Sequence, residues 1–312
     1  MKDNKYKTSI GGQAVIEGVM MRGPKEYAVA VRKPDGEITV EKYPISSIIQ
    51  KHKWLKNFYI IRGIVAFCES LVVGMKSLMF SAEFFDVEEE PSKFDKWIEN
   101  KFGDKAKTFV IYLSVCISLL LCVGMFILLP AFIAGIFFQN EGDTRVWFNV
   151  VEGIIRIGIF LGYIAIVSNM KDIQRVFEYH GAEHKTIFCY EAGEELTIEN
   201  VKKQSRLHPR CGTSFLLIVM VLAIIVFSFF SAANTWIALL QRLVLIPLVA
   251  GIAYEIIKFV GKSENKAICI LNKPGLWFQK FTTREPDDRQ IEVAIESMKS
   301  VIPENKEDAK WW

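Results

Sequence analysis

The stretch TFVIYLSVCISLLLCVGMFILLPAFIAGIFFQN, residues 108 to 140, contains no charged side chain. A helix needs about 20 apolar residues to cross the hydrocarbon core of a bilayer, so this window is long enough to span one. A second charge-free window runs from residue 211 to residue 241. Hydrophobic residues make up 51% of the 312-residue chain, and the mean hydropathy is +0.23. These values are typical of a membrane protein with sizeable polar parts.

The periodicity and length of the apolar segments predict four spans, at about 109–131, 147–169, 213–231 and 236–258. The second predicted span contains Glu152 and Arg156, which are four apart on a helix and can pair on one face. The segment 170–212, between the second and third spans, carries seven lysines and arginines. The positive-inside rule therefore predicts that this segment and both termini are cytoplasmic. The first residues, MKDNKYKTSIGG, lack the apolar region of a cleavable signal peptide.

The N-terminal region is expected to contain short β-strands. Two alternating runs flank Pro34, Asp35 and Gly36, which predicts a hairpin within EYAVAVRKPDGEITVEKYPI. Before it, GGQAVIEGVMMRGP at residues 11–24 has glycines that indicate tight turns or close backbone approach. The polar residues of this segment could line a site; they are Gln13, Glu17 and Arg22. The alternative interpretation is a strand with one face in solvent.

Residues 58–85 predict an apolar helix with one narrow charged stripe. Its charged residues recur every seven positions, at Arg62, Glu69, Lys76 and Glu83. Such a helix can lie in the membrane interface with its stripe towards water. Two alternatives remain open: a helix packed on the spans with its stripe in a polar cavity, and a complete span.

A soluble helix is expected near the C-terminus. Pro286, Asp287 and Asp288 are typical of a helix start. The apolar residues that follow share one face; they are Ile291, Ala294, Ile295, Met298 and Val301. The last ten residues are expected to form a loose tail.

The fold class is thus an α-helical polytopic membrane protein with a small β-containing N-terminal cytoplasmic region. Its predicted parts are the β-containing region at 1–57, the charge-striped interfacial helix and connector at 58–107, the first two spans at 108–169, the cytoplasmic His/Cys loop at 170–212, the last two spans at 213–258, and the cytoplasmic helix and tail at 259–312.

The cytoplasmic loop holds a group of metal-ligating residue types. FEYHGAEHKTIFCY, residues 177–190, has the spacing H-x-x-E-H and a helical rhythm of apolar positions, so His180 and His184 should share one face. Glu183 lies near that face. RLHPRCG then supplies His208 and Cys211. Imidazole and thiolate are preferred ligands of zinc, which takes four ligands in a tetrahedron.

Three interpretations of this group remain open. In a catalytic site, three residues bind zinc, water takes the fourth position, and Glu183 accepts its proton. The motif has the order of inverted zincins, whose third ligand is an acidic residue on a later helix. The candidates for that ligand are Glu191, Glu194, Glu195 and Glu199. In a structural site, His180, His184, His208 and Cys211 close the shell. Without metal, the histidines only make hydrogen bonds.

Other site classes lack support. The sequence has no P-loop, no nucleophile elbow and no dinucleotide fingerprint. The net charge of +3 gives no case for nucleic acid, and basic residues beside a membrane more simply meet anionic lipid. The expected partners are therefore the lipid bilayer, and other membrane proteins or a homo-oligomer.

Four motifs, GGQAVIEGVMMRGP, YHGAEHKTI, HPRCGTSF and TTREPDD, together resemble the YqhQ-like family of bacterial membrane proteins. That family is catalogued as a domain of unknown function and is often labelled a predicted metal-dependent enzyme. The resemblance implies a bacterial inner (cytoplasmic) membrane location. It also implies that segments 11–24, 180–184, 208–214 and 282–288 belong to one architecture and converge on the cytoplasmic face.

Two functional hypotheses follow. The first is a membrane-embedded zinc-dependent hydrolase that cleaves a peptide or a lipid-linked ester at the cytoplasmic membrane surface. Its ligands are His180, His184 and either His208 or Cys211, with Glu183 as the general base. The alternative is a non-catalytic membrane scaffold or biogenesis factor with a structural metal or none. A transporter is a weaker interpretation, because the spans contain few ionisable residues.

Overall fold

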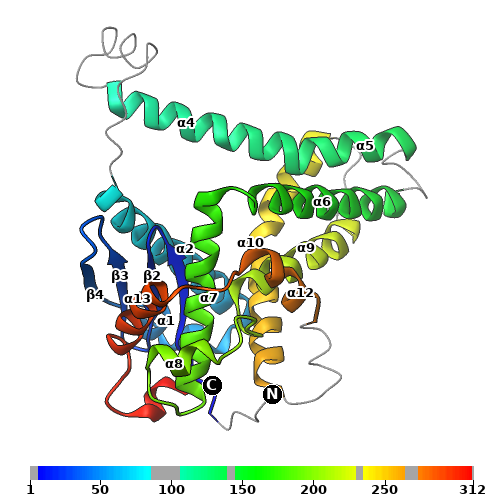
Figure 1. Cartoon of the computed structure of the whole chain (residues 1–312). Helices are drawn as coiled ribbons and strands as arrows, with labels where there is room; N and C mark the ends of the chain where they lie inside the picture. The colour runs from blue at the N-terminus through cyan, green and yellow to red at the C-terminus, as the bar shows by residue number, and fades with distance from the viewer. Residues whose placement is uncertain (1–5, 86–105, 139–144, 230–234, 264–272, 311–312) are drawn as a thin grey trace. The chain divides into compact units, whose positions relative to one another are not determined.

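The structure is a computed structural model that describes residues 6–85, 106–138, 145–229, 235–263 and 273–310 (Figure 1). The chain divides into two compact units. The first comprises Met1–Phe85, Ile164–Ala223 and Leu239–Trp312, and the second comprises Asp86–Tyr163 and Ile224–Ala238. Each unit is described here separately.

The first unit contains a four-stranded antiparallel sheet in the order β1-β2-β3-β4. The strands are β1 (Gly11–Val15), β2 (Gly18–Arg22), β3 (Glu26–Arg32) and β4 (Ile38–Pro44). Gly36 has a φ of 90° in the loop between β3 and β4, which confirms the predicted hairpin. A second hairpin joins β1 to β2. Most of β2 is buried, so a strand with a solvent face is the wrong interpretation for that part of the segment.

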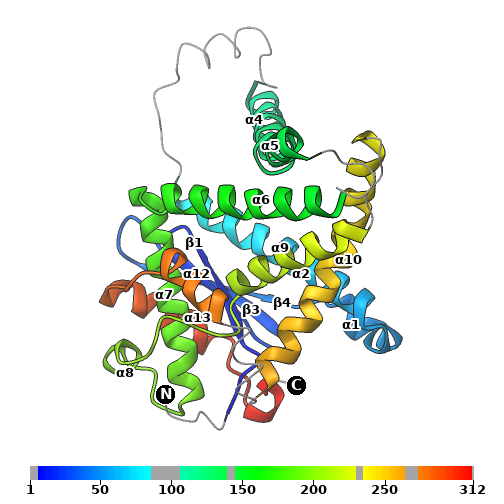
Figure 2. The ribbon, with the colours of Figure 1, turned by 90° about the vertical axis from the view of Figure 1, so that its right-hand side faces the viewer.

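Helices cover both faces of this sheet, because its strands alternate apolar side chains to either side. Val29 and Val31 pack in a cluster with residues of α2 (Tyr59–Ala82) and of the following turn η2 (Glu83–Phe85). Ala28 and Ala30 face the other cluster, with α7 (Lys171–Glu191) and α13 (Asp288–Lys299). The sheet is therefore the middle layer of this unit (Figures 1 and 2).

The predicted C-terminal helix is confirmed as α13. Asp287 caps its first turn, and Gln290 completes a capping box. Its predicted apolar face is buried against the sheet and α7. The end of the chain differs from the expected loose tail: Ala309, in the turn η6 (Lys306–Ala309), is fully buried, and its carbonyl accepts the Ser9 N–H at 2.6 Å.

The charge stripe of α2 faces protein along its first half. Arg62 donates to both carboxylate oxygens of Glu255 on α10 (Thr235–Lys262), at 3.0 and 2.6 Å. Glu69 accepts from the Ser47 hydroxyl at 3.1 Å. The two helices approach closely, because a Cβ atom on Gly63 would overlap the backbone of Gly251. The alternative of a helix packed on the spans agrees with this first half better than a stripe facing water, although Arg62 meets Glu255 directly and not a polar cavity.

Four helices are long and apolar enough to cross a membrane, by length and composition. They are Tyr59–Phe85, Cys116–Phe137, Val146–Val167 and Val244–Gly261. Three of them overlap the spans predicted at 109–131, 147–169 and 236–258. The predicted span at 213–231 corresponds to α9 (Gly212–Phe229), which is a shorter apolar helix within the described residues. The fourth helix that is long enough to cross a membrane is instead α2 with the turn that follows it. The remaining helices are α1 (Ile48–Lys51), η1 (Lys53–Asn57), α8 (Ile198–Lys202) and α12 (Lys273–Thr282).

The second unit is built on α4 (Ala106–Val123), α5 (Leu129–Phe137) and most of α6 (Arg145–Val167). A π-helical segment, Gly124–Leu128, joins α4 to α5. Pro130 has no N–H to donate to Phe126, four residues earlier. Arg156 on α6 donates to the Phe126 carbonyl at 2.9 Å and also pairs with Glu152, which confirms the predicted ion pair.

Candidate metal centre

Helix α7 carries both motif histidines and continues without a break through Gly181. The glycine allows close approach of the chain that precedes α13, because a Cβ atom at 181 would overlap the Arg284 carbonyl oxygen. Arg284 also donates its N–H to the Phe177 carbonyl at 2.9 Å. The helix is therefore regular at Gly181, and the glycine serves packing against the segment that precedes α13.

Both histidines are held by backbone carbonyls at the same ring atom. His180 Nδ1 lies 2.8 Å from the Thr282 carbonyl oxygen, and His184 Nδ1 lies 2.5 Å from the Arg206 carbonyl oxygen. A carbonyl can only accept, so each Nδ1 carries the proton. In the neutral imidazole, each Nε2 is then left with a lone pair. Metal-binding histidines are typically oriented in this way.

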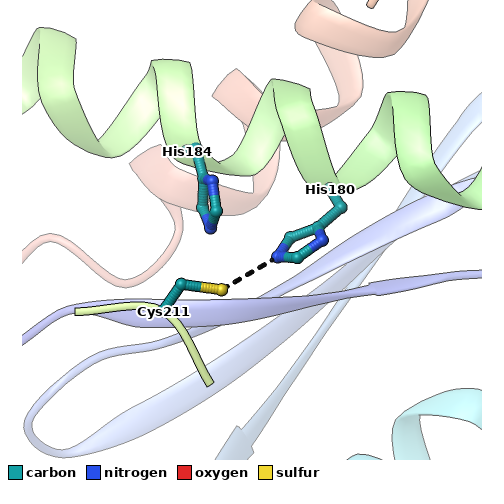
Figure 3. Close-up of side chains that lie close together, drawn as sticks. All are labelled: His180, His184 and Cys211. Carbon is teal, nitrogen blue, oxygen red and sulfur yellow. Dashed lines mark hydrogen bonds between the residues drawn. The ribbon is translucent and has the colours of Figure 1, made fainter. Parts of the chain in front are cut away.

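Cys211 brings a third donor to the two imidazoles (Figure 3). Its Sγ lies 3.2 Å from His180 Nε2. One ligand atom from each of His180, His184 and Cys211 lies within 4.8 Å of the others. His184 Nε2 is buried, and no described residue is its hydrogen-bond partner. A buried nitrogen acceptor without a partner is costly, so this atom is suited to a ligand that the chain itself does not supply.

The cluster favours a charged thiolate. Burial alone would raise the pKa of Cys211, but the two adjacent imidazoles outweigh it and hold the pKa well below its ordinary value. Burial likewise opposes protonation of His180, whereas the Cys211 thiolate raises the pKa of this imidazole to about 9. Because a thiolate is the metal-ligating form of cysteine, this environment prepares Cys211 to bind a cation.

Glu183 lies beside the three donors and against β1. Its carboxylate is 3.8 Å from His180 Nε2 and has a backbone hydrogen bond with Gly12. Burial raises the pKa of Glu183, although the two histidines oppose this shift. A Cβ atom on Gly12 would overlap the Glu183 side chain. The glycine thus lets a strand and a buried carboxylate meet.

His208 lies next to the group of three but is not part of it. Its ring centroid is 5.5 Å from that of His184, and its Nε2 is 3.9 Å from the Glu191 carboxylate. Burial, with a further contribution from Arg210, lowers the pKa of His208 to about 4. Glu191 itself forms a buried ion pair with Arg210. Among the described residues, none of the four proposed acidic ligands joins the histidine and cysteine donors.

A cavity of about 410 Å³ opens beside the donors. It is lined by residues 9–14, by one face of α7 that includes His180, Glu183 and His184, and by residues 208–213. This volume is within the range of small-ligand sites. A metal ion at the three donors would therefore border a space that can hold a substrate.

Several contacts of the site were not identified from the sequence. Gln279 on α12 clamps the backbone of His208, accepting from its N–H and donating to its carbonyl, each at 2.8 Å. Thr282 and Arg206 contribute only carbonyl oxygens, which no residue pattern can indicate. Gly12 and Thr282 do lie in the quoted motifs GGQAVIEGVMMRGP and TTREPDD. All four motifs meet here, because His180 contacts Thr282 and Cys211 while Glu183 contacts Gly12.

The chain is thus a mostly helical protein with a small sheet, candidate membrane spans and a buried His/His/Cys group. It belongs to the family described as "Protein of unknown function (DUF1385)", whose model matches residues 58–304. The chain is also 37% identical to the "Uncharacterized protein YqhQ" of Bacillus subtilis (strain 168), over 97% of this chain and 95% of that protein. No solved structure matches the chain.

Proposed function

We propose that this protein is a zinc-dependent hydrolase of the bacterial inner membrane, whose site lies at the cytoplasmic surface. His180, His184 and Cys211 are the ligands and Glu183 is the general base. The single observation that carries the proposal is that ligand atoms of His180, His184 and Cys211 lie within 4.8 Å of one another. One of these atoms, His184 Nε2, is buried without a hydrogen-bond partner among the described residues. The donor types, and the backbone carbonyls that hold both histidine rings, suit zinc.

The number of protein donors, three and not four, favours catalysis over a structural role. Structural zinc sites are closed by four protein ligands, whereas catalytic sites have three and keep one position for water or substrate. His208 lies beside Glu191 and Arg210 and outside the group of three, so it does not supply a fourth ligand. The adjoining cavity supplies room for a substrate.

Glu183 has the environment of a proton carrier. A zinc ion held by His180, His184 and Cys211 would lower the pKa of a bound water. In hydrolysis, the water oxygen bonds to the acyl carbon, and the bond to the leaving amine or alcohol breaks. Glu183 accepts the proton from the water and delivers it to the leaving group. Its raised pKa and its position 3.8 Å from His180 suit both steps.

The membrane location is supported by sequence and fold together. The four apolar helices are long enough to span a bilayer, and the basic segment 170–212 predicts a cytoplasmic side for the site. A buried site next to membrane helices would act on a bond near the bilayer surface. The lipid bilayer is accordingly the expected partner, and the substrate is a peptide or a lipid-linked ester.

Metal content tests the proposed zinc binding and its ligands. Purified full-length protein is expected to hold one zinc per chain by elemental analysis. His184→Ala and Cys211→Ser should lose most of it, whereas Glu183→Gln should keep it and lose hydrolysis of a peptide and lipid-ester panel. The matched controls are His52→Ala and Cys68→Ser, which change an exposed histidine and an exposed cysteine. Equal zinc in His184→Ala and wild type would overturn the ligand assignment.

One observation favours the second candidate, a scaffold without catalysis. The hydrogen bond between His180 Nε2 and Cys211 Sγ satisfies two of the three donors without an ion. Cobalt substitution separates the two functions. In a hydrolase site, acetohydroxamate should shift the visible cobalt spectrum by binding at the open position. A cobalt spectrum that acetohydroxamate leaves unchanged would indicate a closed structural site.

A further inference from the structure

Strand β1 is an edge strand, and its outer edge borders the candidate metal centre. It pairs only with β2 in the sheet. Residues 9–14 line the same cavity as the three metal-binding candidates and Glu183. Edge strands present unpaired N–H and C=O groups, which are a template for pairing with another extended chain.

The hydrogen-bond pattern shows which groups of β1 point outwards. Arg32 donates its N–H to the Glu17 carbonyl, and Gly23 donates to the Glu26 carbonyl, so odd-numbered residues of β2 bond towards β3. The even-numbered residues of β2 therefore bond towards β1. Their partners in the register are residues 15, 13 and 11. Gly12 and Ala14 consequently direct their peptide groups to the free edge.

The outward N–H groups on either side of Ala14 already have hydrogen-bond partners. Gly12 has its backbone hydrogen bond with Glu183, and the following Ile16 N–H is bound to the Ser81 hydroxyl at 3.2 Å. No described residue outside the sheet accepts from the Ala14 N–H. Its position two residues from Gly12 places it on the same edge, in the cavity wall.

The small residues of this edge leave open space at Gly11, where an added Cβ atom would meet nothing within 4 Å, whereas Glu183 lies against Gly12. Ala14 carries only a methyl group, and Gln13 turns away towards Gly74 of α2. An incoming chain would therefore meet main-chain groups first. Pairing with a sheet edge uses these groups for affinity and leaves side-chain pockets to give specificity.

We propose that the substrate is an extended peptide segment that pairs with the outer edge of β1 through the N–H and carbonyl of Ala14 and the carbonyl of Gly12, the Gly12 N–H being held by Glu183. This inference rests on the proposed function and narrows its substrate from two classes to one. The Gly12 contact with Glu183 holds the paired segment beside the base and the metal ligands. Gly12 and Ala14 are thus substrate-positioning residues for the reaction.

Ala14→Pro tests this pairing with little risk to the fold. Proline removes the outward N–H, which takes no part in the β1–β2 ladder, and edge strands tolerate proline at such positions. Lys42→Pro is the matched control on the opposite edge strand β4. The register pairs Lys42 with Ala28 and Pro44 with Glu26, so both β4 positions point outwards, and one is already proline.

Fluorescence anisotropy of a fluorescein-labelled peptide of alternating threonine and valine measures binding to the full-length protein without requiring activity. Wild type and Lys42→Pro should bind it equally, and Ala14→Pro should bind about tenfold more weakly, the effect of one backbone hydrogen bond. A copy of the peptide with N-methylated backbone should bind wild type as weakly. Equal binding of the labelled peptide by Ala14→Pro and wild type, or none by wild type, would overturn the inference.

Cobalt loading of the same samples distinguishes the two proposals. Ala14→Pro should keep the wild-type cobalt spectrum and its shift with acetohydroxamate. If wild type shows this shift but does not bind the peptide, the peptide inference fails and the metal site stands. If the peptide binds in an Ala14-dependent manner but no cobalt does, the pairing surface stands and the hydrolase proposal fails.

Discussion

Gly181 illustrates how one residue sets the geometry of the site. A glycine within a helix costs about 1 kcal/mol relative to alanine, so the sequence suggested a weak point in the helix. The structure gives the residue another role, because the Arg284 backbone occupies the space where a side chain would start. The same contact brings Thr282 to His180, and thereby orients the first proposed metal ligand.

Gly181→Ala should therefore destabilise the protein instead of strengthening its helix. Displacing the backbone at Arg284 is expected to cost roughly 1–3 kcal/mol, which outweighs the gain of about 1 kcal/mol in helix propensity. Thermal unfolding in detergent measures the change. Gly158→Ala is the control, since a Cβ atom there would meet no other atom within 4 Å. Equal melting temperatures for Gly181→Ala and wild type would contradict this packing role.

The cysteines should differ in reactivity according to their surroundings. Burial, with Glu194 as a lesser cause, raises the pKa of Cys189 to about 11. The unfolded thiol ionises near pH 9, so Cys189 should stay unmodified by N-ethylmaleimide between pH 7 and 9 in the folded protein. Because an unfolded chain would ionise first, this thiol also makes the fold less stable as pH rises above about 9.

Cys211 is expected to react with N-ethylmaleimide in metal-free protein and to be protected by zinc. Its thiolate lies in the cavity wall, where a small reagent can enter. Mass spectrometry after brief labelling, with and without zinc, measures the modification. Protection of Cys211 should disappear in His184→Ala but not in His52→Ala. Labelling that zinc leaves unchanged would argue against Cys211 as a ligand.

Helix α2 shows that elements can be predicted while their surroundings are not. The sequence located the helix and its seven-residue charge spacing, but periodicity cannot say what a stripe faces. The structure turns Arg62 to Glu255 and Glu69 to Ser47, whereas Lys76 and Glu83 are exposed. The first half of the charged stripe thus faces protein and the second half is exposed, a combination that none of the three interpretations contained.

The pair Arg62 and Glu255 should show charge-swap rescue. Arg62→Glu and Glu255→Arg each leave two like charges together in a partly buried place, so each should lower stability by a few kcal/mol. The double variant should recover most of this loss. Scanning fluorimetry in detergent measures it, with Lys76→Ala as a neutral control on the same helix. Additive losses in the double variant would show that the two side chains do not interact.

At the scale of the whole molecule, residues 8–9 pair with residues 309–310. Ser9 donates to the Ala309 carbonyl, and Thr8 donates its N–H to Glu191, the partner of Arg210. The end of the chain therefore supports the segment that enters β1. The composition of the last residues indicated a solvated tail, because it contains no sign of this long-range pairing.

Ala309→Asp should accordingly destabilise the whole first unit. It would bury a carboxylate without an opposite charge, which is expected to cost more than about 2 kcal/mol. Thermal unfolding and zinc content should both fall. Glu307→Ala, an exposed change in the same turn, should leave both unchanged. A wild-type melting temperature for Ala309→Asp would mean that residues 306–310 do not dock in solution.

Membrane orientation is a prediction for the complete chain. A green fluorescent protein fused to the C-terminus should fluoresce, because that end is predicted to be cytoplasmic. Alkaline phosphatase inserted between the first two predicted spans, at residues 139–144, should be active outside the cytoplasm. The reverse pattern would contradict the orientation and would move the proposed site to the other side of the membrane.

The sequence by itself determined the apolar helices, the β3–β4 hairpin, the start of α13 and the placement of His180 and His184 on one helical face. These depend on residues a few positions apart, whose geometry the helix and strand periods fix. Only the tertiary structure decided that Cys211, rather than His208, joins the two imidazoles. It likewise decided that Glu183 meets Gly12 and that the edge of β1 borders the cavity. Such contacts join segments far apart in the chain, and their formation depends on packing and burial, which local sequence does not encode.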